Sequence, residues 1–229
     1  LFSLNSTNFI KKSYMIHNFS KSNSIFSTFI SEIRNVEIQH DSMRFRRNLE
    51  RISEILAYEI SKKLEYKKQD ITTPLGIAEI PLIKDQPVLA TILRAGLGMH
   101  QGFLNYFDGA ESAFISAYRK HTTAEDFDIH VEYLASPKID NKVVIISDPM
   151  LATGSSMALV YKAILQQGNP SKVFVAAAIA TPDALDYLKK RLPDNTEYFI
   201  GAIDDELTAQ AYIVPGLGDA GDLAYGVKC

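Results

Sequence analysis

Two patterns of apolar positions alternate along this chain. Residues 42–66 place apolar side chains at three- and four-residue steps, which predicts an amphipathic helix. Short continuous apolar runs further on are typical of buried strands, and the segments between them have helical spacing. The predicted strands cover 88–93, 112–118, 142–147, 172–180 and 197–203. The predicted helices cover 96–107, 155–168 and 182–192, and Gly168 is a natural helix stop.

This order of elements predicts the fold class. Strands that alternate with helices, and whose apolar runs do not alternate in polarity, favour an α/β fold with a parallel sheet covered by helices on both faces. Two segments depart from the scheme. Residues 72–83 carry prolines at 74 and 81, which predicts extended edge structure or a hairpin, and residues 128–136 alternate as a hairpin strand does.

The stretch VVIISDPMLATGSSM (143–157) places an acid at the end of a buried strand and then a run of small and hydroxylic residues. Ligands of open α/β sheets bind outside the carboxyl ends of the strands, where Asp148 would lie. The following loop leads into a helix, whose free N-terminal amides favour an anion. The stretch therefore predicts a phosphate cradle with a carboxylate beside it, suited to a sugar diol or to a magnesium ion through water. The alternative is a plain strand–turn–helix with a capping Ser or Thr.

A second loop, TILRAGLGM (91–99), also lies between a predicted strand and a predicted helix. Arg94 is followed by small residues that keep the backbone bare, and its planar guanidinium suits a diphosphate. The alternative is that Arg94 is a structural salt-bridge partner. Two anion-binding loops at one sheet edge indicate a ligand with phosphate at both ends.

The third feature is AYIVPGLGDAGDLAYG (211–226), rich in glycine and aspartate. We expect a tight loop rather than a regular helix or strand, with backbone groups that read the edge of a small planar heterocycle and Tyr212 as an aromatic wall. A simple surface turn is the alternative.

Composition narrows the function classes. The net charge of −3 favours neither a nucleic-acid nor a membrane surface, and no apolar run is long enough to span a bilayer. Arginines at 44, 46, 47 and 51 suggest a solvated helix face or an oligomer contact rather than a polyanion site. The only cysteine, Cys229, favours a reducing cytoplasm. Residues 1–14 are expected to be a non-native or loosely ordered leader, and residues 15–229 one domain.

With these motifs the sequence resembles a known family. SDPMLATGSSM resembles the phosphoribosyl diphosphate motif of type I phosphoribosyltransferases, and together with ILRAGLGM and YIVPGLGDAGD it resembles the uracil phosphoribosyltransferases. The resemblance implies transfer of the phosphoribosyl group of 5-phospho-α-D-ribose 1-diphosphate (PRPP) to uracil, giving UMP and diphosphate in pyrimidine salvage. It also implies a parallel sheet core with a small hood, formed by the C-terminal segment, and a β-hairpin arm.

The resemblance also implies roles for the residues that match the family's motifs. The implied catalytic residues are Asp148, Arg94 and Arg119. The implied PRPP site adds Pro149, Met150, Leu151, Ala152, Thr153, Gly154, Ser155, Ser156 and Asp219. The implied uracil site comprises Tyr212, Ile213, Gly218, Asp219 and Ala220. Magnesium is the implied cofactor, bound mainly through diphosphate and water with no direct protein ligand. The segment 119–136 is a candidate lid over the site.

The sequence departs from the wider superfamily in two places. Ser147 stands where many members have a second acid, and Ser155 follows Gly154 where a second glycine is common. We expect the Ser155 exchange to be tolerated if its backbone is helical. A homodimer or higher homo-oligomer is implied, and a purine nucleotide activator is left open. Two other functions stay open: an RNA-binding regulator that retains the fold, and a transferase for another base.

Overall fold

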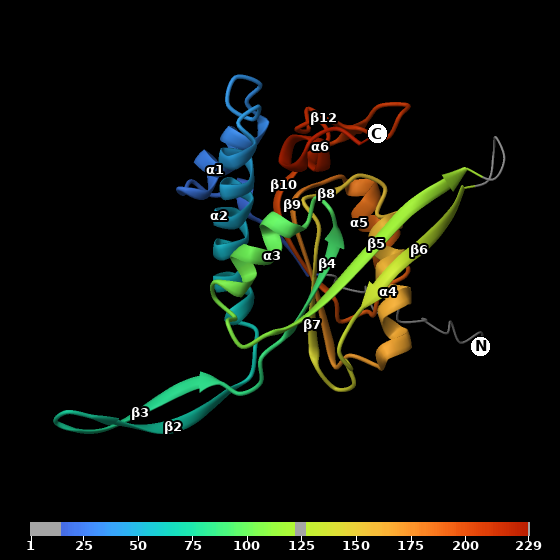
Figure 1. The fold of residues 1–229 in the computed structure, drawn as a ribbon. Coiled ribbons are helices and arrows are strands. Elements are labelled where there is room, and N and C mark those ends of the chain that lie inside the picture. Colours follow the sequence, from blue (N-terminus) through green and yellow to red (C-terminus); the bar gives the residue numbers. More distant parts are fainter. Residues whose placement is uncertain (1–14, 122–126, 229) are drawn as a thin grey trace, which may run out of the picture.

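An eight-stranded sheet forms the centre of the computed structural model, which describes residues 15–121 and 127–228 (Figure 1). The strand order is β1-β10-β9-β7-β4-β5-β6, with the short β8 also paired to β9. Neighbours pair in parallel except β5 and β6. The strands are β1 (Met15–Asn18), β4 (Val88–Leu93), β5 (Glu111–His121), β6 (Phe127–Ala135), β7 (Val143–Ser147), β8 (Met150–Leu151), β9 (Lys172–Ala180) and β10 (Glu197–Ile203).

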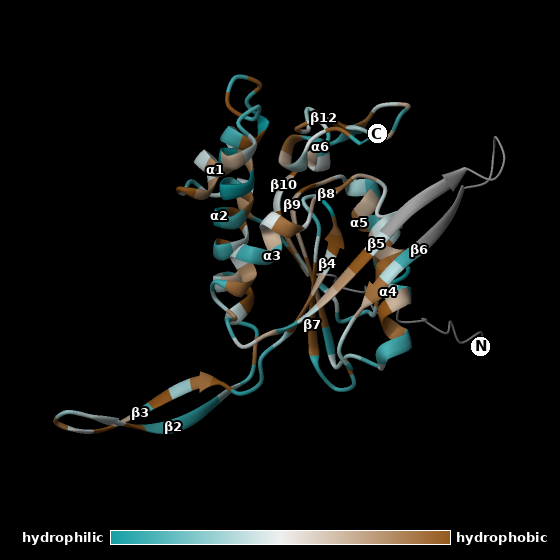
Figure 2. Cartoon of the chain, viewed as in Figure 1, coloured by the Kyte–Doolittle hydropathy of each residue, from teal (hydrophilic) through white to brown (hydrophobic). Residues whose placement is uncertain are grey.

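The apolar runs of the sequence become the interior strands, as predicted. Between 172 and 180 every residue after Lys172 is buried, and β4 and β7 are buried over nearly their whole length. Such strands need cover on both faces. Figure 2 shows the apolar colouring concentrated on these strands and on the helix faces turned toward them.

Helices supply that cover in two layers (Figure 1). One layer packs its apolar residues with Leu89, Ile145 and Phe174, and the other with Ile146 and Val175. The first layer contains α1 (Phe26–Arg34), α2 (Ser42–Ser61) and α3 (Leu97–Leu104), and the second contains α4 (Ser155–Ile164) and α5 (Pro182–Lys189). The predicted α/β class is confirmed. The strand β1 and the helix α1 were not predicted.

Close packing of α3 on α2 fixes the loop that carries Arg94. A Cβ on Gly102 would lie 2.1 Å from the Ser53 Oγ and 2.3 Å from the Glu50 carbonyl oxygen. A Cβ on Gly98 would lie 3.1 Å from the Leu49 Cβ. The glycine at 98 therefore serves helix packing, a role that the prediction of bare backbone after Arg94 did not include.

A hairpin at residues 66–83 projects from the body (Figure 1). It consists of β2 (Tyr66–Thr73) and β3 (Gly76–Ile83), paired antiparallel from Tyr66↔Ile83 to Thr73↔Gly76. This confirms the hairpin expected from the prolines. A second antiparallel pair, β5 with β6, includes the segment predicted to alternate, while residues 122–126 lie outside the described part of the chain.

Helix ends differ from prediction in two places. The helix predicted for 42–66 ends at Ser61, because the chain turns there and residues 66–73 become β2. The helix predicted to run to Gly168 ends at Ile164 and continues as a short 3-10 helix, Leu165–Gln167. Among the described residues no helix has the length and apolar character needed to cross a membrane.

The prediction that residues 211–226 contain no regular structure was wrong. After the short paired strands β11 (Glu206–Leu207) and β12 (Ile213–Val214), the helix α6 spans Ala220–Tyr225. The Asp219 carboxylate caps α6 by accepting from the Asp222 N–H at 2.9 Å. Only part of the glycine-rich run is a turn, and the segment folds over the upper end of the sheet in Figure 1.

Candidate active site

A cavity of about 420 Å³ lies where the carboxyl ends of β4 and β7 meet α6. Its walls come from stretches that are far apart in the sequence. The lining residues are Ile92, Leu93, Arg94, Ala95, Asp148, Met150, Ser156, Asp219, Ala220, Gly221 and Lys228. The structure thus brings together the two loops predicted to bind anions and part of the glycine-rich tail, which the sequence singled out separately.

The loop after Asp148 is tied to the neighbouring strand and helix. The short strand β8 pairs with the end of β9, and the Thr181 N–H donates to the Leu151 carbonyl at 3.0 Å. The Thr181 hydroxyl donates to the Ala152 carbonyl at 2.7 Å and caps α5 by accepting from the Ala184 N–H at 3.0 Å. Because β8 was not predicted, these anchors were not foreseen. They fix the loop without using the side chains of residues 153–156.

The N-terminus of α4 begins directly after Gly154, in the stretch predicted to hold a phosphate. Gly154 has a φ of 74°, and a Cβ there would lie 2.9 Å from the Ala184 carbonyl oxygen, so a side chain at this position would be strained and crowded. No side chain caps α4, although Ser155 N–H makes a long contact of 3.4 Å with the Thr153 hydroxyl. The backbone of Ser155 is helical, which is the condition under which serine was expected to replace a second glycine at this position.

This geometry argues against a turn whose hydroxyls cap the helix. The N-cap residue Gly154 offers no side-chain acceptor and the Ser155 N–H contact to Thr153 is long, so the positive end of the helix dipole favours an anion there. A small cavity of about 70 Å³ lies against this turn and shares Asp148 and Ser156 with the larger one. The pair of cavities is suited to a ligand that places a phosphate at α4 and extends toward Arg94.

Asp148 is in an unusual electrostatic environment for a carboxylate. Desolvation by the surrounding protein raises its pKa from 3.8 to about 7, and a hydrogen bond from the Met150 N–H partly opposes the rise. Its backbone N–H donates to the Ala176 carbonyl at 3.2 Å, so the residue is held at the end of β7. A carboxylate in such a site gains from ligand hydroxyls or a cation that replace lost water.

Arg94 enters the cavity from the end of β4. Its Nη1 donates to the Gly226 carbonyl at 3.2 Å and its Nη2 to the Asp222 carboxylate at 3.2 Å. Its Nε is buried and has no hydrogen-bond partner. The salt-bridge alternative is thus partly realised, but the side chain remains 36% exposed, so further N–H groups are accessible to a ligand.

A buried ion pair holds the glycine-rich segment in place. Arg34 on α1 makes a two-point contact with Asp204, at 2.7 and 2.8 Å, and also donates to the Gly216 carbonyl at 3.0 Å. The Gly216 N–H donates back to Asp204 at 3.0 Å. Sequence reasoning missed both charged residues, since nothing local distinguishes them from surface charges. Together they fix the turn that leads to Asp219.

The residues predicted for a planar base are divided between core and surface. Asp219 and Ala220 line the cavity, whereas Ile213 is 4% exposed and packs in the core. Gly218 has a φ of 92°, so the turn before Asp219 depends on glycine. Tyr212 is 47% exposed, and it is not among the described residues that line the cavity.

Arg119 lies on β5 opposite Ile129 of β6. The placement of its side chain lies outside what the structure describes, so its part in the site stays a prediction. The candidate lid at 119–136 is mostly strand: residues 119–121 and 127–135 belong to the β5–β6 pair, and residues 122–126 are outside the described chain.

Several residues of the site were missed at the sequence level. Lys228 and Gly221 line the cavity, and Asp222 contacts Arg94. Asp222 could have been predicted, because it lies within the glycine-rich motif. No sequence pattern marks Lys228 as a site residue. Both cations and carboxylates therefore face the cavity.

The arginines of α2 have partners within the chain. Arg44 pairs with Glu32 at 2.7 Å, and Arg47 pairs with Glu50 at 2.5 Å. Arg46 donates to the Ala224 carbonyl at the end of α6 at 2.6 Å. The expectation of a solvated face or an oligomer contact was therefore wrong for Arg46, which secures the hood.

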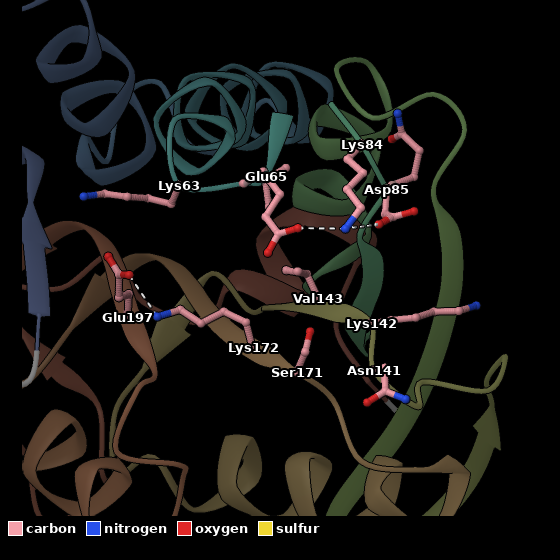
Figure 3. Close-up of a pocket in the computed structure, with 12 residues that line it drawn as sticks. Lys63, Glu65, Lys84, Asp85, Asn141, Lys142, Val143, Ser171, Lys172 and Glu197 are labelled. Atoms are coloured by element: carbon pink, nitrogen blue, oxygen red, sulfur yellow. Dashed lines mark hydrogen bonds and ion pairs between the residues drawn. The ribbon is translucent and has the colours of Figure 1, made fainter. Parts of the chain in front are cut away.

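A larger cavity, of about 720 Å³, lies at the opposite edge of the sheet, where β7, β9 and β10 begin (Figure 3). Lys172 pairs there with Glu197 at 3.0 Å, and Lys84 pairs with Glu65 at 3.0 Å. In Figure 3 the ammonium group of Lys63 points to the side of Glu197, away from the Lys84–Glu65 pair, and its charge also helps to lower the pKa of Glu197. No helix begins among the residues that line this cavity, so it lacks the N-terminal amides that favour an anion at α4.

Comparison with known proteins supplies the family. The model of the family described as uracil phosphoribosyltransferase matches residues 20–227. A uracil phosphoribosyltransferase of Porphyromonas gingivalis is 58% identical over 205 residues, which cover 90% of this chain and 95% of that protein. One of Methanococcus vannielii is 38% identical over 200 residues, covering 86% and 84%. The solved structure of AQ2163 protein from Aquifex aeolicus has a TM-score of 0.82 and 30% identity, covering 93% of this chain and 99% of that one. The chain belongs to the uracil phosphoribosyltransferase family.

Proposed function

We propose that this protein transfers the phosphoribosyl group of PRPP to uracil, giving UMP and diphosphate. The observation that carries the assignment is the single cavity lined by Arg94, Asp148, Ser156 and Asp219. It combines the N-terminus of α4, whose N-cap residue Gly154 has no side chain, for one phosphate, an arginine for a diphosphate and the carboxylate of Asp148. Family membership adds the identity of the base.

The chemistry requires charge stabilisation more than covalent help. When the bond from C1′ to the diphosphate oxygen breaks, positive charge develops on the ribose ring and negative charge on the leaving group. Arg94 stabilises that negative charge, and Arg119 is predicted to assist. Asp148 accepts hydrogen bonds from the ribose hydroxyls and faces the developing positive charge. The amides at the start of α4 hold the 5-phosphate while N1 of uracil bonds to C1′ and its proton passes to the released diphosphate or to water.

The site fits a magnesium ion held as the family implies. Asp148 and Asp219 both line the cavity, and carboxylate oxygens are ligands that Mg²⁺ accepts directly or through water. Among the described residues no group of three or more acidic, histidine or cysteine side chains could hold a metal ion. A substrate that supplies diphosphate oxygens is consistent with this sparse donor set. The ion, when bound, neutralises charge on the diphosphate.

Uracil is expected at the α6 side of the cavity. Ala220 and Gly221 present backbone near the Asp219 carboxylate, and backbone N–H and C=O groups suit the two carbonyls and the N–H of a pyrimidine edge. Ile213 supports this wall from the core. Gly218 shapes the turn, and the role of Tyr212 as a flank of the base stays a prediction.

The function is tested by diphosphate release from PRPP with Mg²⁺, offering uracil, cytosine, adenine, guanine, hypoxanthine and orotate separately. Turnover with uracil alone is the expected result, because the wall at 219–221 presents a fixed backbone pattern. Turnover with another base would retain the phosphate sites and overturn the base assignment. Binding of PRPP without turnover of any base would favour a regulator.

The β2–β3 hairpin supports the proposal that the protein is a homo-oligomer. An isolated two-stranded hairpin is marginally stable in water, yet this one exposes Leu75 fully and Ile77 to 73%. Ile80 and Leu82, on β3, are 40% and 38% exposed. Apolar side chains gathered on a projecting arm are typical of a surface that another subunit covers.

Substituting both Leu75 and Ile77 with Asp is therefore expected to convert an oligomer into a monomer in sedimentation velocity, since it places charges where apolar contacts are inferred. Val36→Asp is the matched control, because Val36 is 68% exposed away from the arm. A wild-type protein that sediments as a monomer would overturn the proposal. The cytoplasmic location, the absence of nucleic-acid and membrane partners and the purine nucleotide activator stay predictions.

A further inference from the structure

The C-terminal segment 219–226, which forms the hood, accepts two hydrogen bonds from the guanidinium of Arg94. Asp222, in the first turn of α6, accepts from Nη2, and the Gly226 carbonyl just after α6 accepts from Nη1. These contacts join residues 128 and 132 positions apart in the sequence. The arginine that we assign to the diphosphate is thus oriented by a segment that belongs to the other side of the cavity.

These two hydrogen bonds leave the guanidinium able to bind a ligand. An arginine side chain carries five N–H donors, and the two contacts engage one on each terminal nitrogen. Each terminal nitrogen retains a second N–H, whereas the Nε donor is buried and has no hydrogen-bond partner. A diphosphate can therefore bind to Arg94 without first displacing Asp222.

The strength of the contact argues for orientation rather than for stability. Charge-assisted hydrogen bonds are typically shorter, at about 2.7–2.9 Å, whereas both contacts here are 3.2 Å. The Arg94 and Asp222 side chains are 36% and 31% exposed, and pairs of this kind stabilise a fold very little. What the pair does restrict is the set of rotamers open to a long, flexible side chain.

Asp222 itself is held from two directions. Its N–H donates to the Asp219 carboxylate at 2.9 Å, which starts α6, and Arg46 donates to the Ala224 carbonyl at 2.6 Å, which secures the end of α6. The orientation of Arg94 is therefore linked through α6 to the carboxylate and backbone that face uracil. One short helix sets the positions of both binding sites.

We propose that Asp222 is a positioning residue, which acts through Arg94 to present its guanidinium to the diphosphate of PRPP. This inference rests on the proposed function. It predicts that loss of the Asp222 carboxylate affects PRPP and leaves uracil alone.

The test is steady-state kinetics of Asp222→Ala and Asp222→Asn with each substrate varied. Asp222→Ala is expected to raise KM for PRPP about tenfold, the size of effect that one lost hydrogen bond to a charged group produces. KM for uracil is expected to stay within about twofold of wild type, since no group touching uracil is changed. The KM of Asp222→Asn for PRPP is expected to lie between those of wild type and Asp222→Ala, because the asparagine amide oxygen still accepts from Nη2.

A double-mutant cycle checks that the effect passes through Arg94. In an Arg94→Lys background, Asp222→Ala should change KM for PRPP by less than about twofold, because the group it orients is gone. Asp183→Ala is the matched control, since Asp183 is the acid in the first turn of α5 and lies outside the cavity lining. It removes a helix-dipole contribution without touching Arg94.

The outcomes separate the two proposals. No turnover of uracil by the wild-type enzyme overturns the proposed function. Wild-type turnover with an unchanged KM for PRPP in Asp222→Ala overturns only the role of Asp222. Equal rises in KM for both substrates, together with a fall in Tm larger than that of Asp183→Ala, would show that α6 has shifted as a whole, and would also overturn the positioning role.

Discussion

Asp148→Asn is expected to lower kcat by about 10²–10³-fold, the range seen when one electrostatic group facing the transition state is removed. Asparagine has nearly the same shape, so the loop and its anchors through Thr181 are preserved. What it lacks is the negative charge beside the developing oxocarbenium ion and the second acceptor for ribose hydroxyls. Steady-state rates with saturating uracil and PRPP measure the loss.

The same variant is expected to be more stable than wild type at neutral pH and above. The pKa of Asp148 rises from 3.8 to about 7 on folding, so this group's contribution to stability is full below pH 4 and is lost as pH rises through 7. A shift of that size corresponds to roughly 4 kcal/mol at most. Asparagine carries no charge, so its advantage in urea unfolding should grow from nothing near pH 4 to its maximum above pH 7.

Lower kcat together with higher stability in Asp148→Asn would distinguish a ligand-binding acid from a structural one. A carboxylate retained for the fold would lower stability when removed, whereas this one is expected to raise it. Wild-type kcat/KM for PRPP should also increase with pH across about 6–8, because only the ionised carboxylate serves the reaction. Unchanged turnover in Asp148→Asn, or a stability loss at pH 8, would overturn the assignment.

Arg94→Ala is expected to reduce kcat/KM for PRPP by about 10²-fold, combining a lost hydrogen bond to a charged group with lost stabilisation of the leaving group. KM for uracil should stay within about twofold, since the wall at Asp219 and Ala220 is untouched. Initial rates with each substrate varied, and calorimetric binding of PRPP with Mg²⁺, measure the two effects separately.

Arg191→Ala is the matched control for Arg94→Ala. Arg191 stacks over the Tyr187 ring, 3.4 Å from its centroid, on the outer surface near the end of α5. Its removal deletes one positive charge from the chain without changing the cavity. An effect of Arg94→Ala confined to uracil, or one matched by the control, would contradict the diphosphate role.

The sheet was predictable because its strands are buried on both faces, which leaves continuous apolar runs such as VLATIL at 88–93. The strand β2 was not, since YKKQDITT at 66–73 is polar and its pairing depends on β3. The error in the tail came from treating every glycine as a breaker. Gly216 and Gly218 do need positive φ, but Gly221 lies inside α6, where the Asp219 cap decides the conformation.

The site followed the same division. The positions of Asp148, Arg94 and Gly154 could be predicted because each follows a predicted strand or opens a predicted helix, so topology implied their place at one sheet edge. Arg34 and Asp204 pair across 170 positions and leave no local pattern. Contacts of that kind, which position the hood over the cavity, are visible only in three dimensions.

The pairing of β1 with β10 has a consequence for biosynthesis. Met15 lies opposite Glu197, so β1 leaves the ribosome long before β10, its one sheet neighbour among the described residues, has been made. Until then β1 is an unpaired strand, and the sheet can close on that side only after nearly the whole domain has emerged. Nascent chains stalled before β10 would therefore expose this segment to chaperones or to misassociation with other nascent chains.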